Sequence, residues 1–223
     1  MTTQTATDLF LKHFEAEVLE QVEEHPKTRE WSAAGRGRKA SLPQGEDGGW
    51  WRANGPKMVQ SWIDWRKRSG WRVLDLGGGT PAIEVEISVD VGGIPLRGYV
   101  DRVMVVPEIN EPVILDLKTG ARSPESDMQL GFYRVGLMKQ HGLDVRFGCY
   151  WMARTGRPSE MLNLRRYKPE LLEKWFTRFD VAREHQIYLP HVTFRCKACP
   201  FNQFCAAYGG RMQHMDPDYE GES

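Results

Sequence analysis

The sequence predicts an α/β (α+β) fold in which an antiparallel β-meander is flanked by helices. Residues 83–91 alternate apolar and polar side chains with a period of two, which is typical of a half-buried strand. The segment 7–24 instead repeats apolar residues near the spacing of a helix. Ser123-Pro124 and Gly142 supply the start and end of another helix, at about 124–140. Glycine and proline separate these segments and supply the turns. Strands and helices therefore share one chain.

Length and charge limit the classes of function. The 223 residues, 40% of them hydrophobic, suffice for one substantial core. Thirty Lys and Arg balance thirty Asp and Glu, so a nucleic-acid surface has to be a local patch rather than a property of the whole protein. No apolar run reaches the roughly eighteen residues of a membrane span. We expect a protein without a membrane partner, in the cytoplasm of a bacterial or phage-infected host cell.

The elements follow in order along the chain. Pro26 ends the first helix, and a loop rich in Gly, Arg and Lys covers residues 32–55. The basic tip of this loop contacts DNA or is simply solvated. Beyond it we expect a helix at 55–69, strands at 83–91, 94–106 and 113–118, a helix at 124–140, a strand at 145–153, and a last helix after Pro169.

Three charged residues interrupt strands that are otherwise apolar. Asp116 and Lys118 lie two apart, so their side chains project from one face of their strand. Asp101 belongs to the preceding strand, and an antiparallel hairpin can place it beside Asp116. Mg²⁺ or Mn²⁺ prefers such oxygen ligands, and Lys118 would orient the attacking water or offset phosphoryl charge. The competing interpretation is a surface ion pair of little energetic value.

The segments GYVD, LDLKTG and QLGFY, taken in this order, resemble the GxxD, (D/E)xK and QxxxY motifs of RecB-like nucleases in the PD-(D/E)XK superfamily. The similarity covers about residues 60 to 206. Within the superfamily it is greatest to the CRISPR-associated RecB-type exonucleases (the fourth Cas protein) and their phage relatives. The resemblance implies a restriction-endonuclease-like core with a mixed central sheet.

The resemblance also implies an activity and further site residues. It implies a Mg²⁺- or Mn²⁺-dependent DNA exonuclease, acting in phage or bacterial recombination, repair or CRISPR-type processing with the corresponding partner proteins. Asp101, Asp116 and Lys118 take the catalytic positions, whereas Gln129 and Tyr133 support the site and contact DNA. On the strand paired with that of Asp101, Glu84 or Glu86 adds a carboxylate or fixes the lysine, or both form a solvent-facing row.

Three of the four cysteines crowd near the carboxyl end. Cys196, Cys199 and Cys205 have a spacing suited to a thiolate metal site. They resemble the C-terminal triplet of iron-sulfur nucleases, which implies a 4Fe-4S cluster, or alternatively zinc. In that family a fourth cysteine precedes the core, and here no cysteine precedes Cys149, which we interpret as a buried thiol.

Besides the fourth cysteine, a second feature of the family is missing at the start of the chain. The family's Gly-x-x-Phe-His region, which supplies a metal-binding histidine, has no match. His13 lies between Lys12 and Phe14 without that glycine pattern, so packing explains it better than ligation. We therefore expect a truncated start or other ligands.

Two alternative functions remain. A nuclease fold can be retained as an inactive DNA- or partner-binding module. The segment VLDLGGGT, residues 73–80, resembles the first motif of S-adenosylmethionine methyltransferases, but such a loop binds a cofactor only when a helix follows it. Here a strand is predicted instead. We assign residues 1–190 to the nuclease domain, 191–210 to the cysteine-containing segment and 211–223 to a disordered tail.

Overall fold

The computed structural model describes residues 3–26, 45–187, 189–193, 196–197, 199 and 201–210. It forms two compact units, Met1–Phe176 and Thr177–Ser223, and the predicted nuclease motifs all lie in the first. The basic loop tip at Arg36, Arg38 and Lys39 and the tail 211–223 lie outside the described residues.

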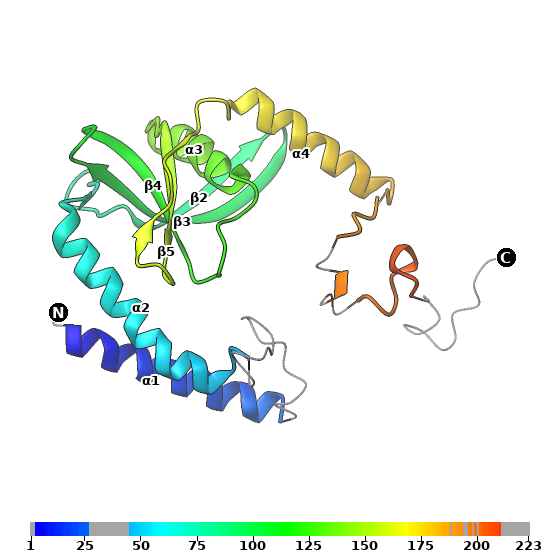
Figure 1. Cartoon of the computed structure of the whole chain (residues 1–223). Coiled ribbons are helices and arrows are strands. Elements are labelled where there is room, and N and C mark those ends of the chain that lie inside the picture. The colour runs from blue at the N-terminus through cyan, green and yellow to red at the C-terminus, as the bar shows by residue number, and fades with distance from the viewer. Residues whose placement is uncertain are drawn as a thin grey trace. The chain divides into compact units, whose positions relative to one another are not determined.

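Two helices, α1 (Thr3–Glu24) and α2 (Gly48–Ser69), lie side by side (Figure 1). A Cβ atom at Gly55 would lie 2.1 Å from Phe10, so glycine is what lets the two helices approach. Our prediction that the loop extends to residue 55 is wrong for 48–55, which are helical. The Asp47 carboxylate caps α2 by accepting a hydrogen bond from Trp50 N. The sequence did not predict the start of α2 at this point because its first two residues are Gly48 and Gly49.

The sheet is mixed, as predicted, and contains seven strands within the described residues. The order is β1-β3-β4-β5-β6, with β2 paired to β3 and β7 to β5. The strands are β1 (Arg72–Val73), β2 (Ile83–Val91), β3 (Ile94–Val106), β4 (Glu111–Lys118), β5 (Phe147–Met152), β6 (Arg157–Pro158) and β7 (Leu162–Asn163).

Strand β3 changes partner part-way along its length. Its first part pairs antiparallel with β2, from Val91↔Ile94 to Ile83↔Arg102. Its second part pairs antiparallel with β4, beginning at Arg102↔Leu115. The change falls at Arg102, directly after Asp101. The β3–β4 ladder therefore ends just before it reaches Asp101.

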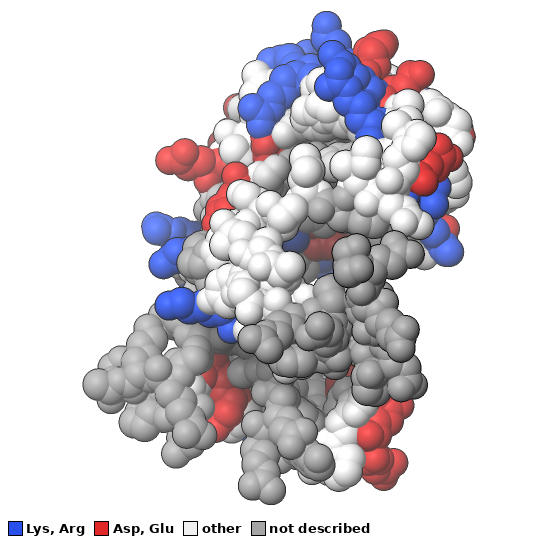
Figure 2. Space-filling view, turned by 90° about the vertical axis from the view of Figure 1, so that its right-hand side faces the viewer, with Lys and Arg blue, Asp and Glu red and all other residues white. Residues whose placement is uncertain are grey.

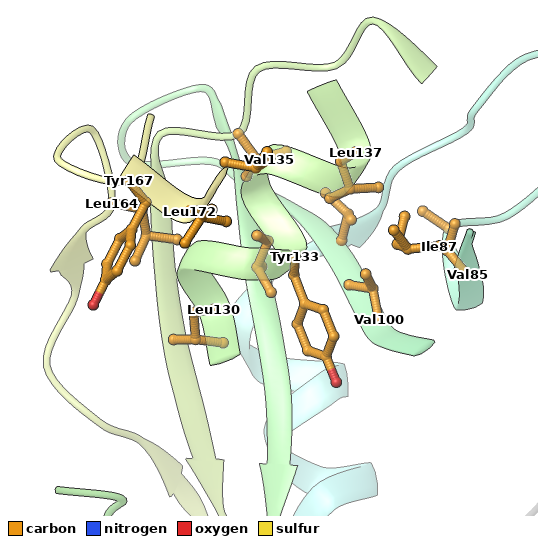
Figure 3. Packing of buried hydrophobic residues seen from close by; sticks show 14 of the residues in the cluster. Val85, Ile87, Val100, Leu130, Tyr133, Val135, Leu137, Leu164, Tyr167 and Leu172 are labelled. Atoms are coloured by element: carbon orange, nitrogen blue, oxygen red, sulfur yellow. The ribbon is translucent and has the colours of Figure 1, made fainter. Parts of the chain in front are cut away.

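Helix α3 (Met128–His141) forms the crossover that makes β5 parallel to β4. Its buried side chains pack on one face of the sheet, where Figure 3 shows Tyr133 beside Val100 and Leu137 near Ile87. The other face of β4 and β5 packs against tryptophans of α2, with Trp62 and Trp151 in an edge-to-face contact at 5.0 Å. Two cores thus sandwich the strands that carry the site.

The described residues also include α4 (Pro169–Glu184) and a short 3-10 helix, Ala206–Tyr208. The six elements predicted between residues 83 and 184 occur in the predicted order, and the two short strands β6 and β7, which we did not predict, lie between the last two of them. None of the helices in the described part combines the length and hydrophobicity that a membrane crossing needs.

Candidate active site

Asp101 lies where β3 leaves β2 and joins β4. Its Oδ2 accepts a hydrogen bond of 2.7 Å from Leu117 N, beyond the last ladder pair. The Asp101 carboxylate thereby takes the place of a backbone hydrogen bond between the strands. Its partner, Leu117, is the residue between Asp116 and Lys118 in the sequence. The two acidic residues come together because the local antiparallel pairing ends at this point.

Asp116 is buried, with 1% of its surface exposed. Lys118 Nζ lies 2.7 Å from Asp116 Oδ2, yet this oxygen has no well-aligned hydrogen bond among the described residues. Burial raises the pKa of Asp116, the Lys118 ammonium opposes that rise, and the charge of Asp101 adds to it. A buried carboxylate oxygen without a full set of partners is costly unless another group binds it.

Gln129 and Tyr133 connect helix α3 to the lysine. Lys118 Nζ donates to Gln129 Oε1 at 3.1 Å, and Gln129 Nε2 donates to the Tyr133 hydroxyl at 2.8 Å. Burial is the largest cause that raises the pKa of Tyr133, and Asp116, Asp101 and Glu84 raise it further. All three carboxylates are therefore close enough to Tyr133 to raise the pKa of its hydroxyl.

The structure separates the two glutamates of β2. The pairs Ile83↔Arg102 and Val85↔Val100 place Glu84 opposite Asp101 in the register. Glu84 has a φ of 50°, which is rare for a residue other than glycine and typical of functional sites. Glu86 forms an exposed ion pair of 2.8 Å with Arg97. Both side chains are exposed, but the register places Glu84 next to Asp101 and Asp116, and we call these three residues the acidic row. Glu86 lies outside this row.

Tyr150 is a site residue that the sequence reasoning missed. It pairs with Asp116 in the parallel register, and Lys118 Nζ lies 5.8 Å from the centre of its ring. The hydroxyl donates to Ser126 O at 3.1 Å, and burial raises the pKa of this phenol to about 12. Its aromatic face supports the ammonium group. The parallel register after the crossover helix is the signal that points to it.

The cysteine triplet does not form a complete ligand set. Cys196 Sγ accepts from Thr193 N at 3.3 Å, and the described residues contain no group of three or more His, Cys, Asp or Glu side chains that fits a metal ion. Cys149 is fully buried, and burial raises the pKa of its thiol to about 12. The residues present therefore do not fit a four-thiolate cluster.

Two arginines that follow β5 already have acidic partners. Arg166 pairs with Asp127, and Arg154 pairs with Glu46. Figure 2 shows Lys and Arg gathered at one end of this face among Asp and Glu, so positive charge is local, as the net charge of zero requires. His13 is exposed on α1.

The glycine turn after β1 is closed on itself. Asp75 accepts from Gly77 N at 2.8 Å and from Gly79 N at 3.2 Å. Strand β2 follows, with no helix between. Because the carboxylate occupies these amides, the turn lacks the free N–H groups of a cofactor loop, which argues against the methyltransferase interpretation.

A family model described as the PD-(D/E)XK nuclease superfamily matches residues 5–206. The chain belongs to this superfamily. Superfamily membership agrees with the mixed sheet and with the chain order of β3, which carries Asp101, and β4, which carries Asp116 and Lys118. A relative from Mycobacterium phage D29, named gene 69 protein, is 27% identical over 93% of this chain and 77% of its own length. The gene 69 protein of Mycobacterium phage L5 is 25% identical over 69% of this chain and 61% of its own length.

A divalent cation fits the donors of this superfamily member. Asp101 and Asp116 supply hard oxygen ligands from adjacent strands, and the buried Asp116 Oδ2 lacks a well-aligned partner. Mg²⁺ and Mn²⁺ need only a few protein carboxylates because they retain bound waters. The donor set therefore matches a hydrated cation, in contrast to the cysteine triplet.

Proposed function

We propose that the chain is a Mg²⁺- or Mn²⁺-dependent deoxyribonuclease with Asp101, Asp116 and Lys118 as catalytic residues. The proposal rests on one observation: a buried carboxylate with an incompletely bonded oxygen lies beside a lysine, at the point where a second carboxylate replaces a ladder hydrogen bond. Superfamily membership supports DNA as the substrate.

Each residue has a separate task in this proposal. Asp101 and Asp116 hold the cation, which when bound supplies an activated water and offsets phosphoryl charge. Lys118, kept in place by Gln129 and by the Tyr150 ring, presents its ammonium to the phosphate or to the attacking water. The side chain of Lys118 is 27% exposed, so substrate can reach it.

The activity test uses end-labelled linear DNA with Mg²⁺, with Mn²⁺ or with EDTA. We expect cutting only with a metal, and loss of cutting in Asp116→Ala and Lys118→Ala proteins that remain folded. Arg97→Gln, which removes an exposed cation outside the acidic row, serves as the matched control. Cutting that persists in EDTA, or in both active-site variants, contradicts the proposal.

We further propose that cutting is exonucleolytic and serves phage DNA recombination, repair or CRISPR-type processing. The resemblance to RecB-like exonucleases and the phage origin of both relatives support this role. Substrates blocked at the 5′ end, at the 3′ end or circularised test it. We expect that circular DNA is not degraded and that a block at one of the two ends stops degradation of linear DNA. Degradation of circles would instead establish internal cutting.

A further inference from the structure

A hollow of about 230 Å³ lies between α2 and the turn that follows β5. Its α2 residues recur at helical spacing and so line one face of that helix. The catalytic proposal uses none of them. The lining combines an aromatic ring, hydrogen-bonding groups and cations: Trp50, Asn54, Lys57, Ser61 and Arg154.

Arg154 is fixed at the wall of this hollow. Its Nη1 lies 2.6 Å from Glu46 Oε1, and the side chains are 11% and 0% exposed. The guanidinium lies 4.8 Å from the centre of the Trp50 ring and 5.1 Å from that of Trp51. A buried ion pair of this kind is weak evidence of a purely stabilising role, because desolvation offsets much of the attraction. The arrangement does hold the Trp50 ring in one orientation.

The hollow adjoins the strand end that carries the lysine of the proposed active site. Arg154 Nε donates to Thr119 O at 2.7 Å, and Ala153 N donates to Lys118 O at 2.9 Å. The wall of the hollow is thus bonded to Lys118 and to the next residue of the chain. The hollow therefore lies at the end of β4 that carries Lys118, but on the α2 side of the sheet, whereas the Lys118 ammonium points to Gln129 of α3. A strand that reaches both has to pass around this end of the sheet.

We propose that the hollow binds one unpaired nucleotide of the DNA strand that is cut. This proposal rests on the proposed nuclease function. The base stacks on the face of Trp50 that Arg154 does not cover, and Ser61 offers a hydrogen bond. The exposed Lys57 contacts a phosphate in place of Asn54 Oδ1, to which it donates at 3.3 Å, while Asn54 Nδ2 stays bonded to Trp50 O at 2.8 Å. Aromatic side chains bind single strands without regard to sequence because every base has a flat face. A base held in a duplex cannot reach such a ring without leaving its stack. The substrate class is therefore DNA with a single-stranded segment.

The test measures binding in EDTA, where the strand stays intact, by fluorescence anisotropy. An oligothymidylate is compared with an abasic oligonucleotide of equal length and charge. We expect wild-type protein to prefer the base-containing strand by about tenfold, the Trp50→Leu protein to lose this preference, and the Trp50→Phe protein to retain most of it. A blunt duplex of equal length should bind more weakly than the single strand.

A second measurement does not depend on the tryptophan. Lys57→Gln should lower the slope of log affinity against log salt by about one unit. Lys67→Gln removes an equally exposed cation further along α2, and its slope should match that of wild type. Equal affinity of wild-type protein for both strands, or a preference that survives in Trp50→Leu, overturns the subsite.

Failure of the subsite is distinguishable from failure of the nuclease proposal. If only the subsite is wrong, wild-type protein still cuts DNA with Mn²⁺, and Trp50→Leu and Lys57→Gln cut it with the wild-type KM. If the nuclease proposal is wrong, wild-type protein cuts no DNA under any of these conditions.

Discussion

Asp116 combines the strongest functional indication with the clearest energetic cost. Burial raises its pKa, so its carboxyl group binds a proton more readily in the folded chain than in the unfolded one. Metal-free stability therefore falls as pH rises from the ordinary carboxylate range through the raised pKa. Proteins commonly accept such a cost at a site where the charge is needed.

We predict that Asp116→Asn raises the free energy of unfolding of the metal-free protein at pH 7 by on the order of 1 kcal/mol, because an uncharged amide replaces a buried charge. The melting curves of the two proteins should converge below about pH 4, where the aspartate is protonated in both states. Added Mn²⁺ should raise the Tm of wild type but not of the variant. A wild-type protein that is more stable than the variant in EDTA contradicts the argument.

The glutamates of β2 give a matched pair of variants. Glu84 lies opposite Asp101 with a positive φ, whereas Glu86 pairs with Arg97 in solvent. We predict that Glu84→Gln lowers the cleavage rate by about tenfold, the equivalent of one lost charge interaction, and that Glu86→Gln leaves it unchanged. Single-turnover rates at saturating Mn²⁺ measure this. Equal effects of the two substitutions refute the assignment.

Cysteine labelling distinguishes the buried thiol from the triplet. Because burial raises the pKa of Cys149 to about 12, its reactive thiolate is scarce in the folded chain. We predict that iodoacetamide modifies Cys196, Cys199 and Cys205 in native protein, and Cys149 only after denaturation. Mass spectrometry of the peptides reads this out. Protection of the triplet that disappears with a chelator would instead indicate a bound metal.

At the scale of elements, close packing of α3 on β2 determines where Gln129 and Tyr133 lie. A Cβ atom at Gly136 would lie 2.2 Å from Ile87 Cγ2, and Ile87 is fully buried. We predict that Gly136→Ala destabilises the protein by about 1–3 kcal/mol through overpacking, despite the better helix propensity of alanine. Gly48→Ala, where nothing lies within 4 Å, is the control and should be neutral or stabilising. Chemical denaturation compares the two.

The strands of the proposed active site could be predicted from the sequence because their patterns are local. Asp101 and Asp116 were recognisable as carboxylates inside apolar, period-two runs, and Lys118 followed from its spacing. The start of α2 was not recognisable, since Gly48 and Gly49 have poor helix propensity and the helix packs through Gly55. The role of Tyr150 depends on a parallel register that only the folded crossover establishes.

At the scale of the whole molecule, one ion pair joins distant parts of the chain. Glu46 and Arg154 are separated by 108 positions, and no local pattern predicts their contact. The pair fixes the start of α2 to the end of β5, and Arg154 also donates to Thr119 O, directly after β4. Such long-range contacts are what sequence reasoning leaves undetermined.

We predict that Glu46→Gln or Arg154→Met alone costs about 3 kcal/mol, because each leaves a buried charge without its partner. The double variant should cost less than the sum of the two, and a double-mutant cycle from urea denaturation measures the coupling. Glu15→Gln, which breaks the exposed pair with Arg52, is the control and should change stability by under about 1 kcal/mol. Strict additivity of the two buried substitutions rejects the coupling.

The Asp101–Leu117 hydrogen bond makes assembly of the proposed active site depend on the native register between β3 and β4. A chain that misfolds by slipping β4 one residue against β3 turns every β4 side chain to the opposite face. Such a chain presents Leu115 and Leu117 where Asp116 and Lys118 belong, and it loses the bond to Asp101 at the same time. Under the proposed function, such misassembled copies would not cut DNA, and on heating, cutting should cease as soon as the β3–β4 junction opens.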